Sequence, residues 1–486
     1  MSGIEGGRPN VAIFTQENDN RFYTEPAVNR VFSAASDIIR NKTIGRVPHL
    51  GAGILASEAR AQGWDVSYLD FDPNKVVAEA EKYSLIFLSA LDISVDRVNS
   101  ILDSNPNLDG KVVVGGQGIS PIANEFASKH PDTGVVEGRG EGVCKTVLND
   151  FSQQGYVKGL YRRKYPLSLA DADKEPYMDP EFTFRNDVKF KDSIVKPLEL
   201  STGCTQACSM CPVGGEKVTV KPLSTIKTEI DMMRLRPQDI LLFVDHNLLN
   251  ANRNYLLQLF TYINERGIRW TGEGTISQII KDDQLLRVMA KNSLSILSGL
   301  ETIDEGLTGS QVKDRLRVDF AHVNKVLRSV GFPVTWSMVF PLDSHSPESF
   351  LQTAKFIWDH KIDVNMHLLQ PRLGSELYDT VTKEDRWIDT DSRMRDGVHL
   401  VYQQKKMSRE EAIAGYVWLK GKITSPAWLY RKFVANMKEL GPRKAVTLLG
   451  LAISTDGLMA SRIRQVYPEL HTLLDDYEAR WQQMIG

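Results

Sequence analysis

The sequence is poor in cysteine and lacks any long apolar run. Only four cysteines occur among 486 residues. Three of them fall within eight positions, which is typical of a metal site in a reducing compartment and not of a disulfide framework. No run of about 18 or more uncharged apolar residues is present, so no membrane-spanning helix is expected. The first ten residues also lack the charged and then apolar pattern of a signal peptide, and we expect a cytoplasmic protein.

An excess of charge of either sign is also missing. Lys and Arg number 59 against 61 Asp and Glu, which gives a formal net charge of −2. This balance provides no general attraction to a polyanion, and a nucleic acid is not an expected partner. A chain of this length is expected to form about two to four domains, each with its own hydrophobic core.

Residues 10–150 alternate short apolar runs with amphipathic stretches. Strands are predicted over residues 11–16, 66–71, 84–91 and 111–116, and helices over residues 51–63 and 95–105. This alternation predicts an α/β domain with a doubly wound, Rossmann-like parallel sheet. Because ligands of such sheets bind at the carboxyl ends of the strands, we expect Thr15, Ser89 and the Gly115–Gly116 pair to converge on one crevice.

Two segments lack clean periodicity. About 34 residues separate the first predicted strand from the first predicted helix, far more than a usual strand-to-helix loop contains. This segment is either a functional cover or binding element, or a surface insertion. Residues 156–195 are rich in Pro, Asp and Tyr and are predicted to link the first domain, residues 1–155, to the next one.

Strand and helix patterns alternate again over residues 196–385. The predicted strands cover residues 196–202, 239–247, 268–275, 295–302, 333–342 and 364–371, with helices between them. Six units of this kind predict a partial (β/α)6 barrel. Residues 386–486 look mainly helical and are predicted to form a C-terminal helical domain.

The strongest motif lies directly after the first predicted barrel strand. Cys204, Cys208 and Cys211 are separated by three and then two residues. This spacing lets one loop offer three thiolates to three irons of a [4Fe–4S] cubane while the fourth iron stays open. A zinc site or three unrelated buried cysteines are the alternatives, but zinc usually takes a fourth ligand at short spacing and the nearest histidine is His246. The remaining cysteine, Cys144, lies in a helical pattern and is expected in the core.

This cysteine motif and several weaker segments resemble one known family, the radical S-adenosylmethionine (AdoMet) enzymes with an N-terminal cobalamin-binding domain. The segments that resemble its second-, third- and fourth-strand regions are FVDHNLLNANRNYLLQL, IRWTGEGTISQIIKDDQLLRVMAKN and SILSGLETID. The sixth-strand region is LLQPRLGSELYD, and KKMSREEAIAGYVWL is similar to the helical C-terminal extension of some members. The resemblance covers nearly the whole chain. It implies that AdoMet binds the open iron through its amine and carboxylate and is cleaved reductively to a 5′-deoxyadenosyl radical.

The resemblance also implies an AdoMet site around the cluster. The candidates are Met210 near the adenine, Asp245 near the amino group, Glu273, Ser277 and Glu301 near the ribose or the carboxylate, and Gln370 at the end of the last barrel strand. For two of these carboxylates, a purely structural role is the alternative to AdoMet binding. Asp245 is also suited to cap the turn that follows it, and Glu301 to form a salt bridge.

A cobalamin site is implied for the first domain. Ser89-Ala90-Leu91 resembles the family's Ser-x-Leu motif, and Gly115-Gly116 resembles its glycine pair, where glycine is expected to let the backbone approach the flat cofactor. The sequence GRGEG at 138–142 resembles the next strand-end loop, in which Glu141 would close the site. The implied cobalamin-binding residues are Thr15, Gln16, Ser89, Ala90, Leu91, Gly115, Gly116, Gln117, Gly118, Gly140 and Glu141.

The family's cobalt-ligating histidine motif is missing, because the first strand ends in TQENDN. Many cobalamin radical enzymes lack this histidine as well, so cobalt without a protein imidazole is expected. His49 lies just before the first predicted helix and is the candidate axial ligand if one exists. A buried, hydrogen-bonded histidine is the alternative.

Together these expectations describe a cobalamin-dependent radical AdoMet enzyme that methylates an unactivated carbon of a small molecule. An external one-electron donor of the flavodoxin or ferredoxin type would be its redox partner. Rearrangement, cyclisation or oxidation with cobalamin in another role or absent, and a non-catalytic cobalamin or iron–sulfur sensor, are the alternatives. The residues expected either to contact the substrate or to lie in the core are Trp336, His367, Arg372, His399 and Tyr402.

Overall fold

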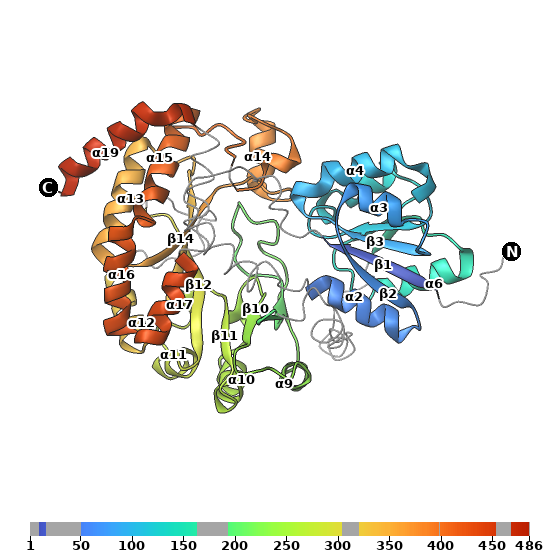
Figure 1. Ribbon diagram of the computed structural model, residues 1–486, viewed down its shortest axis with the longest axis horizontal. Helices are drawn as coiled ribbons and strands as arrows, with labels where there is room; N and C mark the ends of the chain where they lie inside the picture. Colours follow the sequence, from blue (N-terminus) through green and yellow to red (C-terminus); the bar gives the residue numbers. More distant parts are fainter. Residues whose placement is uncertain are drawn as a thin grey trace. The chain divides into compact units, whose positions relative to one another are not determined.

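The chain forms two compact units in a computed structural model (Figure 1). The structure describes residues 9–15, 50–162, 193–303, 320–397, 399–452 and 468–485. The first unit contains the described residues up to 162 together with 391–393, and the second contains the other described residues from 193 onward. None of the helices in these ranges has the length and apolar content that crossing a membrane requires.

The first unit is built on a six-stranded parallel sheet, which confirms the predicted Rossmann-like fold. Its strands are β1 (Asn10–Thr15), β2 (Asp65–Asp70), β3 (Leu85–Ser89), β4 (Val112–Gly115), β5 (Gly134–Glu137) and β6 (Gly159–Arg162). The strand order β2-β1-β3-β4-β5-β6 reverses between β1 and β3. Thr15 pairs with Ser89, and Ser89 pairs with Gly115, so the predicted strand ends lie in register at this reversal.

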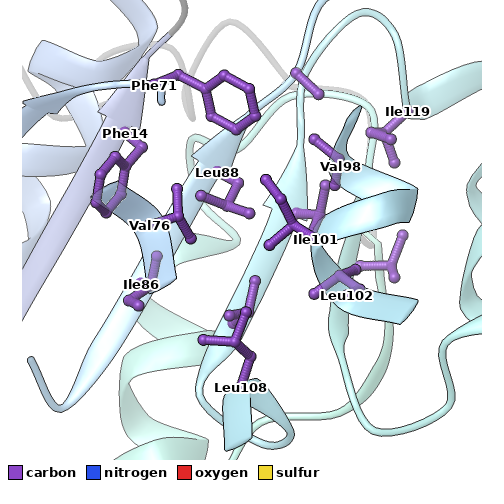
Figure 2. Packing of buried hydrophobic residues seen from close by; sticks show 14 of the residues in the cluster. Phe14, Phe71, Val76, Ile86, Leu88, Val98, Ile101, Leu102, Leu108 and Ile119 are labelled. Atoms are coloured by element: carbon purple, nitrogen blue, oxygen red, sulfur yellow. The ribbon is translucent and has the colours of Figure 1, made fainter. Parts of the chain in front are cut away.

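Helices cover both faces of this sheet, because side chains along each strand alternate between the faces. One face carries α2 (Leu50–Ala61) and α6 (Cys144–Gln154), and the other carries α3 (Pro73–Glu79), α4 (Val95–Ser104) and α5 (Ala123–Lys129). Ile13 faces the first set, whereas Phe14 faces the second. Figure 2 shows Phe14, Leu88 and Ile101 in the cluster on the second face. Cys144 is buried in the cluster on the first face, which confirms its predicted place in the core.

The second unit contains the six parallel strands of the predicted partial barrel. These strands are β7 (Val195–Leu198), β10 (Ile240–Phe243), β11 (Arg269–Glu273), β12 (Ser293–Glu301), β13 (Val334–Phe340) and β14 (Asp363–Leu368). They are hydrogen-bonded in chain order, from β7 at one edge to β14 at the other. The intervening helices are α9 (Leu223–Met232), α10 (Arg253–Glu265), α11 (Asp283–Ala290), α12 (Phe320–Ser329) and α13 (Pro347–His360), and α14 (Glu376–Lys383) follows β14.

The C-terminal helices belong to the same compact unit as the barrel strands. They are α15 (Arg409–Ile423), α16 (Pro426–Glu439), α17 (Pro442–Ala452) and α19 (His471–Ile485). The Lys420 ammonium donates to the Met366 carbonyl at 2.6 Å, and the Tyr416 hydroxyl donates to the same carbonyl at 3.1 Å. α15 therefore satisfies a backbone group of the edge strand β14, which would otherwise need another partner. The finer division into domains at residues 156, 196 and 386 stays a prediction.

Candidate functional site

The three clustered cysteines lie on one closed loop of the second unit. β8 (Ser201–Thr202) pairs in antiparallel fashion with β9 (Thr219–Val220), and this short hairpin joins the two ends of the loop. Cys204 and Cys208 are buried, with 3% and 6% of their surface exposed, and Cys211 is partly exposed. The Cys211 amide donates to the Cys208 carbonyl at 3.0 Å, which turns the chain between these two residues.

A glycine is required where the loop leaves the hairpin. Gly203 has a φ of +77°, in the region that residues with a side chain rarely adopt. A Cβ atom at this position would lie only 2.4 Å from the carbonyl oxygen of Lys217, in the segment that leads from the loop into β9. The close approach of the two loop ends therefore depends on the missing side chain directly before Cys204.

The donor set fits an iron–sulfur cluster. None of the three cysteines forms a disulfide, and all three lie on one short loop that follows the carboxyl end of β7. Among the described residues, no three His, Cys, Asp or Glu side chains are grouped around a position for one metal ion. A cubane presents a different arrangement, because each thiolate binds its own iron and the sulfur atoms need not meet at a point. Soft thiolate ligands suit such a cluster.

Asp245, which follows β10, holds the start of the cysteine loop. One carboxylate oxygen accepts from the Leu200 amide at 3.0 Å, and the other accepts from the amide and, at 2.7 Å, from the hydroxyl of Ser201. Only 2% of Asp245 is exposed. Burial is the main cause that raises its pKa to about 7, the Glu199 carboxylate raises the pKa further, and the three hydrogen bonds oppose the shift. Asp245 thus ties β10 to the residues that lead into Cys204, and its predicted place near the AdoMet amino group stays a prediction.

Hydrogen bonds between amide side chains also connect the cysteine loop to the end of the next strand, β11. The Asn250 side chain donates to the Gly203 carbonyl at 3.3 Å, and its oxygen accepts from Asn247 at 3.1 Å. Asn247 also donates to Gln278 at 3.1 Å and accepts from the Thr275 amide at 3.0 Å. The end of β11 is therefore linked to the cysteine loop. Asn247, Asn250 and Gln278 were not predicted as site residues, although polar side chains in the segments that follow apolar strands were an available signal.

The predicted ribose and carboxylate contacts lie at the carboxyl ends of two adjacent strands. Glu273 is the last residue of β11 and is exposed, and Ser277 lies in the short helical turn that follows. Glu301 is the last residue of β12 and is buried, with 6% of its surface exposed. Because β11 and β12 are parallel, Glu273 and Glu301 lie at the same end of the sheet, where the strands have their carboxyl ends. Their contact with AdoMet stays a prediction.

Two further candidates lie on the β14 side of the barrel. Met210 packs against an apolar cluster made of Leu342, Leu369, Val381, Val401 and Tyr402. The Leu377 amide of α14 donates to the Ser209 carbonyl at 2.9 Å, so α14 holds the cysteine loop beside Met210. Gln370 is buried and donates to the His399 carbonyl at 2.9 Å, while its side-chain oxygen has no hydrogen-bond partner among the described residues.

The expected substrate contacts divide into core residues and surface-facing residues. Trp336 packs against Phe320 at 5.1 Å between ring centroids and is buried, as is Tyr402. His399 is partly exposed and lies 3.1 Å from the Asp396 carboxylate. Arg372 donates to the Arg395 carbonyl, and His367 is partly buried in β14. Trp336 and Tyr402 thus follow the alternative in which these aromatic residues form core.

The glycines at the strand ends of the first unit have a packing role. A Cβ atom on Gly116, whose φ is +103°, would lie 2.6 Å from the Ala90 carbonyl oxygen. A Cβ atom on Gly118 would lie 2.4 Å from the Leu91 carbonyl carbon. The Gly118 amide also donates to the Ala90 carbonyl at 3.0 Å. The close packing of two neighbouring loops therefore requires glycine at these two positions, and their contact with cobalamin stays a prediction.

The remaining candidates of the first unit lie beside the end of β5 or outside the described residues. Glu141 pairs with Arg139 at 2.7 Å, and a Cβ atom on Gly140 would lie 3.0 Å from the Leu55 side chain. A Cβ atom on Gly138 would meet no atom within 4 Å, so space is open beside this turn. Gln117 is exposed. Gln16 and His49 lie outside the described residues, and only the backbone of Thr15 is described.

Comparisons with known proteins identify the fold. No protein-family model and no curated protein matches the sequence. The similar solved structures include the cobalamin-dependent AdoMet radical enzyme OxsB with aqua-cobalamin and AdoMet bound, at 11% identity and a TM-score of 0.60, over 98% of this chain and 84% of that one. The radical AdoMet methyltransferase TsrM from Kitasatospora setae, with cobalamin and a [4Fe–4S] cluster bound, is 14% identical with a TM-score of 0.56, over 77% of this chain and 75% of TsrM. The family resemblance is thus confirmed at the level of the fold.

Proposed function

We propose that this protein is a cobalamin-dependent radical AdoMet enzyme that methylates an unactivated carbon of a small molecule. The observation that carries the proposal is the closed loop with three cysteines that form no disulfide, placed after β7 in a fold shared with OxsB and TsrM. When bound to Cys204, Cys208 and Cys211, a [4Fe–4S] cluster supplies the electron that breaks the C5′–S bond of AdoMet.

The side chains around the loop would bind and orient AdoMet. With three irons ligated by the thiolates, the amine and carboxylate of AdoMet would take the fourth. Glu301, Glu273 and Ser277 lie at the carboxyl ends of β11 and β12, the end of the sheet at which the cysteine loop follows β7, and would hold the ribose or the methionyl group. Met210 lies within the loop itself and would pack near the adenine, with Gln370 as a further contact. Asp245 would keep the loop in position.

Cobalamin would bind to the first unit at the carboxyl ends of its strands. The register of Thr15, Ser89 and Gly115 at the reversal of strand order supports this position, because ligands of doubly wound sheets bind there. Bound there, methylated cobalamin supplies a methyl group to a carbon radical.

The proposed reaction would consume two molecules of AdoMet and two electrons. One electron would cleave the first AdoMet to methionine and a 5′-deoxyadenosyl radical, which would take a hydrogen atom from the substrate and leave as 5′-deoxyadenosine. Cobalamin held by the first unit would supply the methyl group to the substrate radical. The second AdoMet would replace that methyl group and leave as S-adenosylhomocysteine, and this step would need the second electron to return the cobalt to its nucleophilic state. An external one-electron donor of the flavodoxin or ferredoxin type would supply both electrons.

Methyl transfer predicts that the methyl group of AdoMet appears in a product. The reconstituted protein, with cobalamin, a reductant and a small-molecule cell extract as substrate source, would be incubated with AdoMet that carries a trideuterated methyl group. Mass spectrometry should find a product heavier than its substrate by about 17 mass units, the mass of CD₃ less one hydrogen. 5′-Deoxyadenosine and S-adenosylhomocysteine should form together.

The competing radical reactions predict a different pattern. Rearrangement, cyclisation or oxidation would consume the substrate without incorporating deuterium and without S-adenosylhomocysteine above background. This result would contradict methyl transfer and leave the radical chemistry in place. A non-catalytic sensor would form no 5′-deoxyadenosine at all.

A further inference from the structure

The end of β12 has an unusual backbone conformation. Glu301 has a φ of +59°, although it carries a side chain. The Thr302 amide donates to the Leu300 carbonyl at 2.7 Å, so Glu301 is the centre of a γ-turn of the rare left-handed kind. The pairing of β12 with β13 also shifts register between Gly299 and Glu301. Such irregularities redirect a side chain, and they persist only where surrounding contacts hold them.

A buried histidine provides the contact that holds this turn. His345 follows β13, is fully buried and packs on Phe340 with 4.4 Å between ring centroids. Its Nδ1 accepts from the Leu342 amide at 3.0 Å, and its Nε2 lies 2.8 Å from the Thr302 hydroxyl oxygen. One imidazole therefore connects the residue after Glu301 to the segment that follows β13.

The environment of His345 also fixes its hydrogen-bonding direction. Burial lowers its pKa to about 3, with a smaller contribution from Lys406, so the ring is neutral at ordinary pH. A neutral imidazole has one protonated nitrogen, and Nδ1 cannot carry the proton because it accepts from the Leu342 amide. The proton is on Nε2, which donates to the Thr302 hydroxyl oxygen.

We propose that His345 is a positioning residue that holds the Thr302 hydroxyl and thereby fixes the γ-turn that directs Glu301 toward AdoMet. The inference rests on the proposed function, since it assigns Glu301 to the AdoMet site. It adds a residue that lies after a different strand, β13, and that acts through Thr302. The left-handed conformation costs about 1–3 kcal/mol where a side chain is present, so the turn depends on such a contact.

Two amide substitutions separate the two hydrogen bonds of His345. Glutamine can place an N–H group near the Nε2 position and keep the bond to Thr302, whereas asparagine can place an oxygen near the Nδ1 position and keep only the bond to Leu342. In cluster-loaded protein, His345→Gln should bind AdoMet within about threefold of the unaltered protein, and His345→Asn should bind at least about tenfold more weakly. Titration calorimetry with AdoMet measures both, and iron content should be unchanged in both.

Thr302→Val provides an independent variant of the same contact. It should weaken AdoMet binding as much as His345→Asn does, and the double variant should be no weaker than either single one, because both remove one interaction. The inference is overturned if His345→Asn and Thr302→Val bind AdoMet as the unaltered protein does, if His345→Gln is as weak as His345→Asn, or if the two effects add. Failure of the unaltered, cluster-loaded protein to bind AdoMet would instead overturn the proposed function.

Discussion

Replacement of Cys208 by alanine is expected to remove nearly all iron from the anaerobically reconstituted protein. The unaltered chain should hold about four irons and four sulfides, because three thiolates on one loop are the ligands of a site-differentiated cubane. In Cys208→Ala only two thiolates remain, so two of the four irons have no protein ligand. Cys208 is buried in the loop, and alanine offers no ligand atom in its place. Colorimetric iron and sulfide analysis, together with the visible absorption of the cluster, measures the effect.

Cys144→Ala is the matched control. Cys144 is buried between α2 and α6 in the other unit, and burial raises the pKa of its thiol, so it stays protonated and is a poor ligand. Its substitution removes one buried sulfur and should leave the iron content unchanged. Full iron and full AdoMet cleavage in Cys208→Ala, or equal iron loss in both variants, would contradict the assignment of the cluster.

Asp245→Asn is expected to weaken the cluster site without unfolding the barrel. The amide has one acceptor oxygen, so an N–H group of Leu200 or Ser201 would face the new NH₂ group instead of an oxygen. A buried donor left without a partner costs about 2 kcal/mol, which is a factor of about 30 in an equilibrium constant. Because these residues lead into Cys204, the loop should order less well and the iron content should fall. The comparison belongs at pH 8, above the Asp245 pKa of about 7, where the carboxylate is ionised.

Asp282→Asn provides the control for this substitution. Asp282 accepts from the Leu285 amide at the start of α11 and pairs with Arg253, away from the cysteine loop. Asparagine caps helices about as well as aspartate does, so iron content should not change. If Asp245→Asn keeps all its iron but no longer binds AdoMet, Asp245 acts on the cosubstrate directly, as the family resemblance implies, and the anchoring role is wrong.

The sequence predicts most of the fold because the spacing of its apolar residues clearly distinguishes strands from helices. The strand at residues 11–16 and the helix at 51–63 appear within two residues of their predicted limits, since each has an unambiguous pattern. β5 and β6, each four residues long, were not assigned, because so short a run fits strand, turn or helix equally well. The order of the strands follows from the alternation of strand and helix, which favours neighbouring parallel strands.

The site is less accessible to sequence reasoning, because its contacts join residues that are far apart in the chain. The spacing of Cys204 and Cys208 is local and was readable, whereas the bond between His345 and Thr302 spans 43 residues. The left-handed turn at Glu301 was also hidden, since sequence patterns predict that conformation only at glycine or asparagine. Gly116 illustrates a third case, because the packing of the neighbouring loop that requires a glycine there cannot be read from the motif, and its contact with cobalamin stays a prediction.

The release of 5′-deoxyadenosine distinguishes a radical AdoMet enzyme from a protein that only holds a cluster. The cluster-loaded protein would be mixed anaerobically with AdoMet and a chemical reductant, and the products would be measured by liquid chromatography and mass spectrometry. 5′-Deoxyadenosine and methionine should form in equal amounts, and neither should rise above background with Cys208→Ala. If the protein holds its full cluster and binds AdoMet, yet releases no 5′-deoxyadenosine above the protein-free control, it is not a radical AdoMet enzyme.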